Sequence, residues 1–132
     1  MPRQRIKLRE FLGSAARKSV RDRTVAPGEN PAVQAFWDVI AMIPAGKVCT
    51  YGEVARMAGF AGRARQVGYA LRLMPSDMNL PWHRVVGAGG RIVFPKSSSH
   101  FREQSRLLRS EGVKVTQGRV ELSALVVTDK WQ

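Results

Sequence analysis

Residues 50–73, TYGEVARMAGFAGRARQVGYALRL, decide the fold. Thr50 and Glu53 form a capping-box pattern, in which each side chain bonds the backbone N–H of the other residue, so a short helix begins here. A turn containing Gly59 follows, and helical spacing resumes over about residues 62–73. A short helix, a glycine-bearing turn and a basic second helix are typical of a helix-turn-helix, although such pairs also occur in unrelated proteins.

The second helix of this pair has two different faces. Its small and apolar residues, which permit close packing, are Ala64, Val67, Gly68 and Leu71. Its polar residues, around the rest of the helix, are Arg63, Arg65, Gln66 and Arg72. An exposed arginine on a helix is more often a solvated charge than a DNA contact, but the basic composition of the chain adds weight to DNA contact here.

Further helices and small β elements are expected on both sides of the pair. Asn30 as N-cap and Pro31 as first residue begin a helix, whose apolar stripe is Val33, Phe36, Trp37, Ile40 and Ile43. A final helix is expected over about residues 101–111, ending at Gly112, and Trp131 is expected to pack the tail onto the domain. Two hairpins are expected to pair residues 85–87 with 91–94 and 113–115 with 119–122.

The composition indicates a nucleic-acid partner. The 132 residues include 22 Lys and Arg against 10 Asp and Glu, a net charge of +12, and the pI is ≈ 11.3. Such an excess of positive charge attracts polyanions, chiefly nucleic acid. We recognise no membrane span and no secretory signal, so the expected location is cytoplasmic, nucleoid-associated in a bacterium, with no membrane partner.

Residues 1–30 are expected to form a basic extension, separate from a DNA-binding domain over residues 31–132. Eight positive and three negative residues give the extension +5 of the total charge (8 − 3 = 5). Apolar positions that include Ile6 and Val20 predict a weak amphipathic helix, and residues 26–31 are typical of a linker. The extension is either an arm on a phosphate backbone or a solvated, partly disordered tail.

Residues 81–85, Pro-Trp-His-Arg-Val, are the most informative for function. Trp82 cannot act as a nucleophile, but its indole offers a flat apolar face and one N–H donor. Trp82 can stack on an extruded base, Tyr51 can contact a phosphate at a helix start, and Arg65 can enter the base stack or a groove. Considered separately, Tyr51 and Arg65 also fit the alternative that each is an ordinary surface residue.

Catalytic, metal and cofactor chemistry has little support in the sequence. The histidines are His83 and His100, and with one cysteine they do not give a usual zinc site. His83 is either a structural histidine or a catalytic base. Cys49 lies in an extended apolar stretch typical of a buried cysteine, and the alternative, a reactive thiol, requires a lowered pKa. No glycine-rich run has a nucleotide-binding pattern, so no cofactor and no metal are expected.

Four motifs together resemble the DNA-binding domain of the O6-alkylguanine-DNA alkyltransferases. They are IPAGKVCTYGEVA (43–55), ARQVG (64–68), PWHRVV (81–86) and LLRSEG (107–112). Because Trp82 replaces the alkyl-accepting cysteine, the chain is more closely similar to the alkyltransferase-like group. The resemblance covers about residues 31–131 and implies a mainly α fold with small β elements, a winged helix-turn-helix-like domain that enters the minor groove.

The resemblance also implies roles for individual residues. Tyr51 matches the tyrosine that turns the target phosphate, and Arg65 matches the arginine that fills the vacated stack. Trp82 is implied to line the pocket for the flipped base. His83 and Glu111 match a relay that activates the missing thiol, so here the relay is expected to be structural.

Departures from the alkyltransferase pattern concern the pocket. Met74 replaces an asparagine that braces the active-site loop, and residues 94–100 lack the run that closes the pocket. The residues expected at the lesion pocket are Trp82, Tyr51, His83 and Val85. The residues expected to contact DNA are Tyr51, Arg63, Arg65, Gly68, Arg72, Arg91 and Lys96.

The resulting functional hypothesis is a non-catalytic, monomeric sensor of DNA damage. It would flip O6-alkylguanine out of duplex DNA into a pocket lined by Trp82 and flag it for nucleotide excision repair proteins. One alternative is an active alkyltransferase that uses Cys49. Another is a helix-turn-helix transcription regulator that recognises a fixed sequence.

Overall fold

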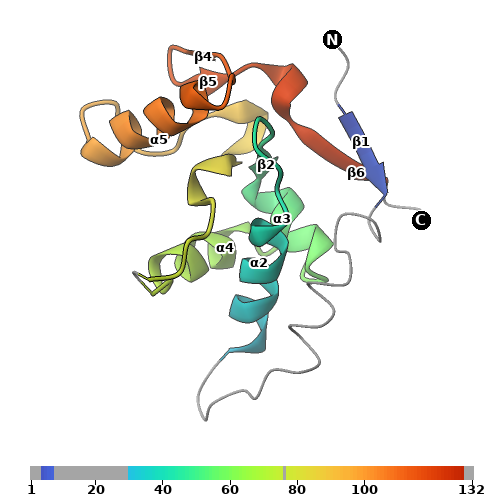
Figure 1. Ribbon diagram of the computed structural model, residues 1–132. Helices are drawn as coiled ribbons and strands as arrows, with labels where there is room; N and C mark the ends of the chain where they lie inside the picture. Colours follow the sequence, from blue (N-terminus) through green and yellow to red (C-terminus); the bar gives the residue numbers. More distant parts are fainter. Residues whose placement is uncertain (1–3, 8–29, 76, 130–132) are drawn as a thin grey trace.

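The computed structural model describes residues 4–7, 30–75 and 77–129. The helices of these residues are α2 (Pro31–Ala41), α3 (Tyr51–Met57), α4 (Ala64–Arg72) and α5 (Ser99–Ser110). Figure 1 shows α2, α3 and α4 together on one side of the molecule and α5, with a small hairpin, on the other. The segment between α4 and α5 runs between the two groups. The expected class, mainly α with small β elements, is confirmed.

The group of three helices is built around α2. The helix begins as expected, because Asn30 Oδ1 accepts the Ala32 N–H at 2.9 Å. Phe36 is fully buried on its inner face. Trp37 Nε1 donates to the Ala70 carbonyl at 2.8 Å, which fastens α2 to α4.

The helix-turn-helix is formed by α3 and α4. Thr50 Oγ1 accepts the Glu53 N–H at 3.1 Å and caps α3. The helix ends in a Schellman motif, in which the Phe60 N–H bonds the Ala55 carbonyl at 2.9 Å. Gly59 takes the left-handed conformation that this motif needs, with φ +91°.

The second helix of the pair is shorter than expected. The sequence predicts residues 62–73, whereas α4 begins at Ala64 and ends at Arg72. The start is later because Gly62 has φ +85°, which is incompatible with a right-handed helix. Its buried residues are Val67 and Ala70, so the inward face is rotated from the expected one.

The expected pairing of residues 85–87 with 91–94 is wrong. Instead β3 (Val85–Val86) pairs in parallel with β2 (Cys49–Thr50), far away in sequence. Between Gly87 and Arg91, η2 (Ala88–Gly90) forms a tight turn, and the Gly87 N–H donates to the Arg91 carbonyl at 2.7 Å. The backbone of Arg91 instead forms an isolated antiparallel β-bridge with Arg119. The second hairpin is confirmed: β4 (Val115–Thr116) and β5 (Arg119–Val120) pair antiparallel.

Helix α5 lies over a second buried cluster that includes Leu108 and Val86. It begins earlier than expected, because Ser98 Oγ accepts the Phe101 N–H at 3.1 Å and caps it. The expected stop at Gly112 is confirmed by its φ of +87°. This ending fixes the last turn of α5, and with it the residue before the glycine, Glu111.

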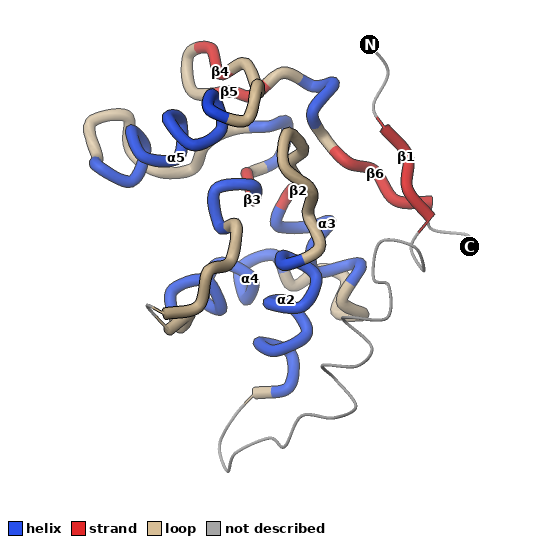
Figure 2. The backbone as a smooth tube through the Cα atoms, in the orientation of Figure 1, coloured by secondary structure: helices blue, strands red, loops and turns tan. Residues whose placement is uncertain are grey.

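The N-terminal part of the chain contributes one described strand. Figure 2 shows β1 (Gln4–Lys7) beside β6 (Val126–Asp129), and the two pair in parallel. The helix expected to include Ile6 is therefore wrong at that residue. Residues 8–29 and Trp131 lie outside the described residues, so the division near residue 30 and the packing of the tail stay predictions. None of the helices in the described part of the chain is long and apolar enough to cross a membrane.

Candidate functional site

The short turn η1 (Trp82–Arg84) organises the site. It places Trp82 against a cavity on one side and buries His83 on the other. From α5, the Gln104 side chain amide donates to the carbonyls of His83 at 3.0 Å and Val85 at 2.9 Å. The buried glutamine therefore holds the backbone of the turn, and with it the indole, in position.

Trp82 forms one wall of a cavity of about 670 Å³, the Trp82 cavity. Its lining residues are Tyr51, Gly68, Leu71, Arg72, Met74, Trp82, Val93, Phe94 and His100. Phe94 meets the indole edge-on, with ring centroids 6.2 Å apart and planes at 81°. His100 stacks on Phe94 at 5.1 Å and 24°. This wall of aromatic rings is suited to a flat apolar group.

The opposite wall of the Trp82 cavity comes from the helix-turn-helix. Tyr51 is the first residue of α3, and burial raises the pKa of its hydroxyl, which stays a neutral donor. Gly68 of α4 leaves open space, since a Cβ placed there would meet no atom within 4 Å. Arg72, in the last turn of α4, adds a positive charge at this wall.

Behind Trp82 lies a polar cluster centred on Glu111, the Glu111 cluster, which also contains His83, Arg84 and Gly46. His83 Nε2 lies 2.8 Å from Glu111 Oε2. Arg84 grips the same carboxylate with two nitrogens, Nε at 3.0 Å from Oε1 and Nη2 at 2.7 Å from Oε2. The Gly46 N–H donates to Oε1 at 3.2 Å. Arg84 Nη1 also donates to the Ile43 carbonyl at 2.7 Å, which ties in the loop after α2.

The Glu111 carboxylate is ionised at neutral pH. Burial would raise its pKa, but the hydrogen bonds from Arg84, His83 and Gly46 outweigh burial and lower the pKa to about 2. A carboxylate only accepts hydrogen bonds, so His83 Nε2 is the nitrogen that donates to it. The His83–Glu111 pair that the resemblance implies is therefore hydrogen-bonded. Arg84, which the sequence did not indicate, binds the same carboxylate.

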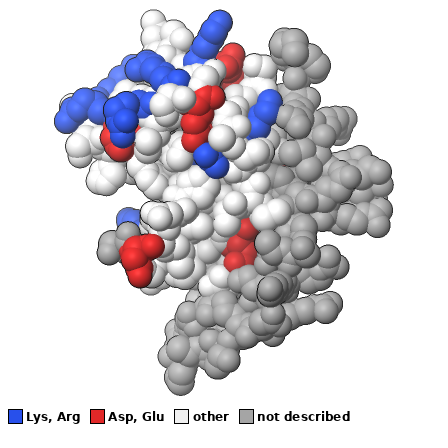
Figure 3. Space-filling model, in the orientation of Figure 1, with Lys and Arg blue, Asp and Glu red and all other residues white. Residues whose placement is uncertain are grey.

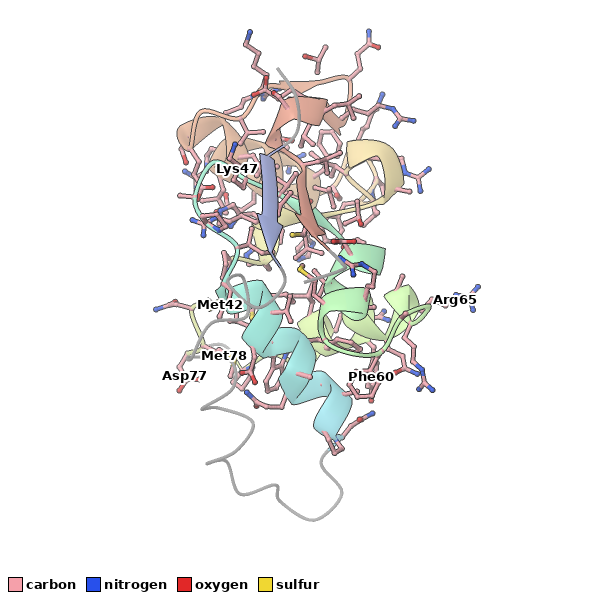
Figure 4. The ribbon with its side chains drawn as sticks, turned by 90° about the vertical axis from the view of Figure 1, so that its right-hand side faces the viewer. Met42, Lys47, Phe60, Arg65, Asp77 and Met78 are labelled. Carbon is pink, nitrogen blue, oxygen red and sulfur yellow. The ribbon has the colours of Figure 1, made fainter. Side chains whose placement is uncertain are left out.

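The other predicted site residues lie in several places. Val85 is 1% exposed in the core, and neither it nor His83 lines the Trp82 cavity, because the turn faces both away from it. Arg63 is the exposed N-cap residue of α4. Figure 4 shows Arg65, in the first turn of α4, projecting away from the molecule. Arg91 is exposed beyond η2.

Lys96 lies apart from the Trp82 cavity, beside the arginines of α5. The expected contacts are therefore divided between the α4 side of the molecule and the α5 side. Sequence reasoning also missed four residues of the cavity lining, Leu71, Val93, Phe94 and His100. The spacing of Leu71 from Gly68 on one helix face was an available signal. Val93 and Phe94 lie in a segment before α5 that matches no motif, and His100 lies in the first turn of α5.

Cys49 cannot reach the Trp82 cavity as a reactive group. It is 0% exposed in β2. Burial, with a smaller contribution from the charge of Glu53, raises the pKa of its thiol to about 12. A thiol with this pKa stays protonated and is a poor nucleophile at neutral pH. Within the described ranges, no three side chains of His, Cys, Asp or Glu are grouped to hold a metal ion.

Known proteins are similar to this chain in sequence and in fold. A family model described as the 6-O-methylguanine DNA methyltransferase, DNA binding domain, matches residues 31–113. A DNA base-flipping protein of Escherichia coli (strain K12) is 41% identical over 95 residues, which cover 71% of this chain and 72% of that protein. Alkyltransferase-like protein 1 of Schizosaccharomyces pombe is 41% identical over 81 residues, 61% of this chain and 75% of that protein.

Solved structures give the same result. S. pombe Atl1 in complex with damaged DNA containing O6-carboxymethylguanine superposes with a TM-score of 0.61 at 37% identity, covering 69% of this chain and 87% of that one. Mycobacterium tuberculosis OGT in complex with DNA superposes with a TM-score of 0.53 at 34% identity, covering 60% of this chain and 48% of that one.

Proposed function

The chain belongs to the family of the 6-O-methylguanine DNA methyltransferase DNA-binding domain, and on that premise we propose that it recognises damaged DNA without repairing it. The protein binds duplex DNA with its helix-turn-helix in the minor groove, flips O6-alkylguanine into the Trp82 cavity, and holds it there as a monomer. The held lesion is then a mark for nucleotide excision repair proteins.

The observation that carries this proposal is that residue 82 is a tryptophan and not a reactive cysteine. A tryptophan stands at the cavity wall where a reactive thiol would have to stand, and it offers stacking in place of nucleophilic attack. The chain's single thiol, Cys49, is buried and has a pKa of about 12. The site therefore has the means to bind a base, while the usual means of accepting an alkyl group are missing.

The dimensions of the Trp82 cavity favour a base with a bulky substituent. At about 670 Å³, it lies in the range of roughly 300–1,000 Å³ that is typical of small-ligand sites. Leu71, Met74 and Val93 give its lining an apolar character that tolerates alkyl groups of different size. Selectivity then depends on stacking, shape and the weaker pairing of the damaged base, which lowers the cost of flipping.

The arginines at and near α4 support DNA as the partner. Arg65 and Arg72 are exposed on α4, and Arg63 is exposed at its N-cap. Gly68 of the same helix lines the Trp82 cavity. In this proposal Arg65 enters the base stack as the target leaves it, and its outward projection in Figure 4 supports that role. Since the net charge is +12, binding should release counterions and weaken steeply as salt is raised.

The decisive experiment measures affinity for matched duplexes that contain either O6-methylguanine or guanine. We expect tighter binding to the damaged duplex, and equal affinity would reject the proposal. Trp82→Ala should remove most of the preference, because loss of a stacking partner costs about 1–3 kcal/mol per base. Trp82→Phe, which keeps an aromatic face, should retain more of it and serves as the matched control.

A second measurement separates recognition from repair. After incubation with the damaged duplex, the mass of the protein should be unchanged, and an added alkyl group on Cys49 would instead establish an alkyltransferase. The link to excision repair is tested by incision of an O6-alkylguanine duplex by reconstituted excision proteins. We expect the wild-type protein to raise incision and the Trp82→Ala variant to fail.

A further inference from the structure

A second cavity lies along the outer side of α5. It has a volume of about 340 Å³ and is lined by Lys96, Phe101, Arg102, Ser105, Arg106 and Arg109, the α5 groove. Figure 3 shows Lys and Arg side chains gathered over the part of the surface where Figure 1 places α5. The α5 groove therefore combines four cationic side chains with one aromatic ring.

Three of the four cations of the α5 groove, Lys96, Arg102 and Arg109, keep most of their bonding capacity. Arg102 Nη1 donates to the Ser97 carbonyl at 3.0 Å and Arg109 Nη2 to the Val115 carbonyl at 2.8 Å. Among the described residues, neither arginine nor Lys96 has a carboxylate partner. A guanidinium has five N–H donors, so each arginine can still bind an acidic group.

The floor of the α5 groove contains an unused polar group. Ser105 is 4% exposed, and its hydroxyl has no hydrogen-bond partner among the described residues. Buried hydroxyls are normally bonded, so an unpartnered one beside basic side chains is unusual. Phe101 lies next to it and is half-buried, which gives the groove an apolar contact as well.

The α5 groove faces away from the Trp82 cavity. His100 lines the Trp82 cavity and Arg109 lines the groove. They are nine residues apart on one helix, about two and a half turns at 3.6 residues per turn, so they project from opposite sides of it. DNA that places a base beside Trp82 approaches α5 on the His100 side and leaves the groove open.

We propose that the α5 groove is a docking site for an acidic segment of a partner protein. Carboxylates of the segment pair with Arg102, Arg109 and Lys96, and an apolar side chain packs on Phe101. Glu103, which bridges Arg106 at 2.7 Å, interrupts the positive surface. That interruption suits a few discrete carboxylates better than the unbroken charge of a phosphodiester backbone. Binding of the acidic segment does not depend on what the Trp82 cavity binds, whereas simultaneous binding of DNA and the segment rests on the proposed function.

The test uses the full chain and a short fluorescent peptide in which Asp and Glu alternate with Leu and Phe. Fluorescence anisotropy should detect binding, and a peptide with Asn and Gln in place of the acids should not bind. Arg102→Glu should weaken the acidic peptide at least about tenfold, and Lys114→Glu, an equal charge change outside the groove, should not. Arg102 is exposed on α5, and circular dichroism checks that the variant folds.

Competition distinguishes a protein partner from nucleic acid. A saturating, stoichiometric amount of O6-methylguanine duplex should leave peptide affinity unchanged. Displacement of the peptide by duplex or single-stranded DNA would assign the α5 groove to nucleic acid and overturn the proposal. Equal binding of the amide peptide, or equal weakening by Lys114→Glu, would overturn it too, because neither depends on the residues of the groove.

Discussion

The two sides of η1 differ in how much of their bonding capacity is already used. On the front, the Trp82 cavity is wide, mainly apolar, and walled by rings that touch one another edge-on or stacked. On the back, the Glu111 cluster is compact, and each carboxylate oxygen accepts two or more hydrogen bonds. The difference indicates that the front is left free for a ligand and the back holds the structure that positions it.

The largest expected effect comes from disrupting the Glu111 cluster at the back of η1. Glu111→Gln removes the charge that holds Arg84 and His83, and leaves the guanidinium partly buried without its counter-ion. We expect the free energy of unfolding to fall by about 3 kcal/mol, near the lower end for loss of one partner of a buried pair. Urea denaturation followed by circular dichroism measures this change.

The exposed Glu103–Arg106 pair on α5 gives the matched control. Glu103→Gln makes the same chemical change in a fully solvated pair, so its urea midpoint should not move measurably. If the two variants were equally stable, the Glu111 cluster would not be what stabilises η1.

The second expected effect is a dependence of stability on pH. The pKa of Glu111 is lowered from 4.5 to about 2 in the folded protein, so the unfolded chain takes up its proton first as pH falls. Stability supplied by Glu111 is therefore fully present above about pH 4.5 and is lost between about pH 4.5 and about pH 2. Urea titrations across this window should show the loss in the wild type and a smaller loss in Glu111→Gln.

The third expected effect concerns Gln104, which joins the two sides. Gln104→Met keeps the volume of the side chain but leaves the His83 and Val85 carbonyls without their donor. We expect a loss of about 1–2 kcal/mol in the free energy of unfolding, typical of buried polar groups left unpaired. The same variant should lower the preference for damaged DNA, whereas an unchanged preference would show that the indole is positioned by its own packing.

The sequence was most informative where structure depends on neighbouring residues. The caps at Asn30 and Thr50 and the stop at Gly112 were predictable, because each depends on a few adjacent residues. The parallel pairing of β2 with β3 was not, since alternation within one strand carries no information about a distant partner. The hairpin expected over residues 85–94 failed for that reason.

The same distinction applies to the site. Tyr51, Trp82 and Glu111 were identified because they stand in recognisable motifs. Arg84 was missed, although it is next to His83, because its partners are the Ile43 carbonyl and the Glu111 carboxylate, both distant in sequence. His100 reaches the Trp82 cavity only because the cap at Ser98 starts α5 early.

The smallest expected effect is at Cys49. It tests whether the thiol of the chain can react with a group held in the Trp82 cavity. Cys49 is a small buried residue in β2, away from the lining of the Trp82 cavity, so Cys49→Ala should cost only about 1 kcal/mol of stability and leave affinity for DNA unchanged. Iodoacetamide at about pH 8, near the ordinary cysteine pKa, should not modify the folded wild type, because its thiol stays protonated and shielded. Added urea should restore the reaction. Rapid modification of the folded protein would mean that the thiol is reachable, and the absence of a nucleophile at residue 82 would then no longer exclude alkyl transfer.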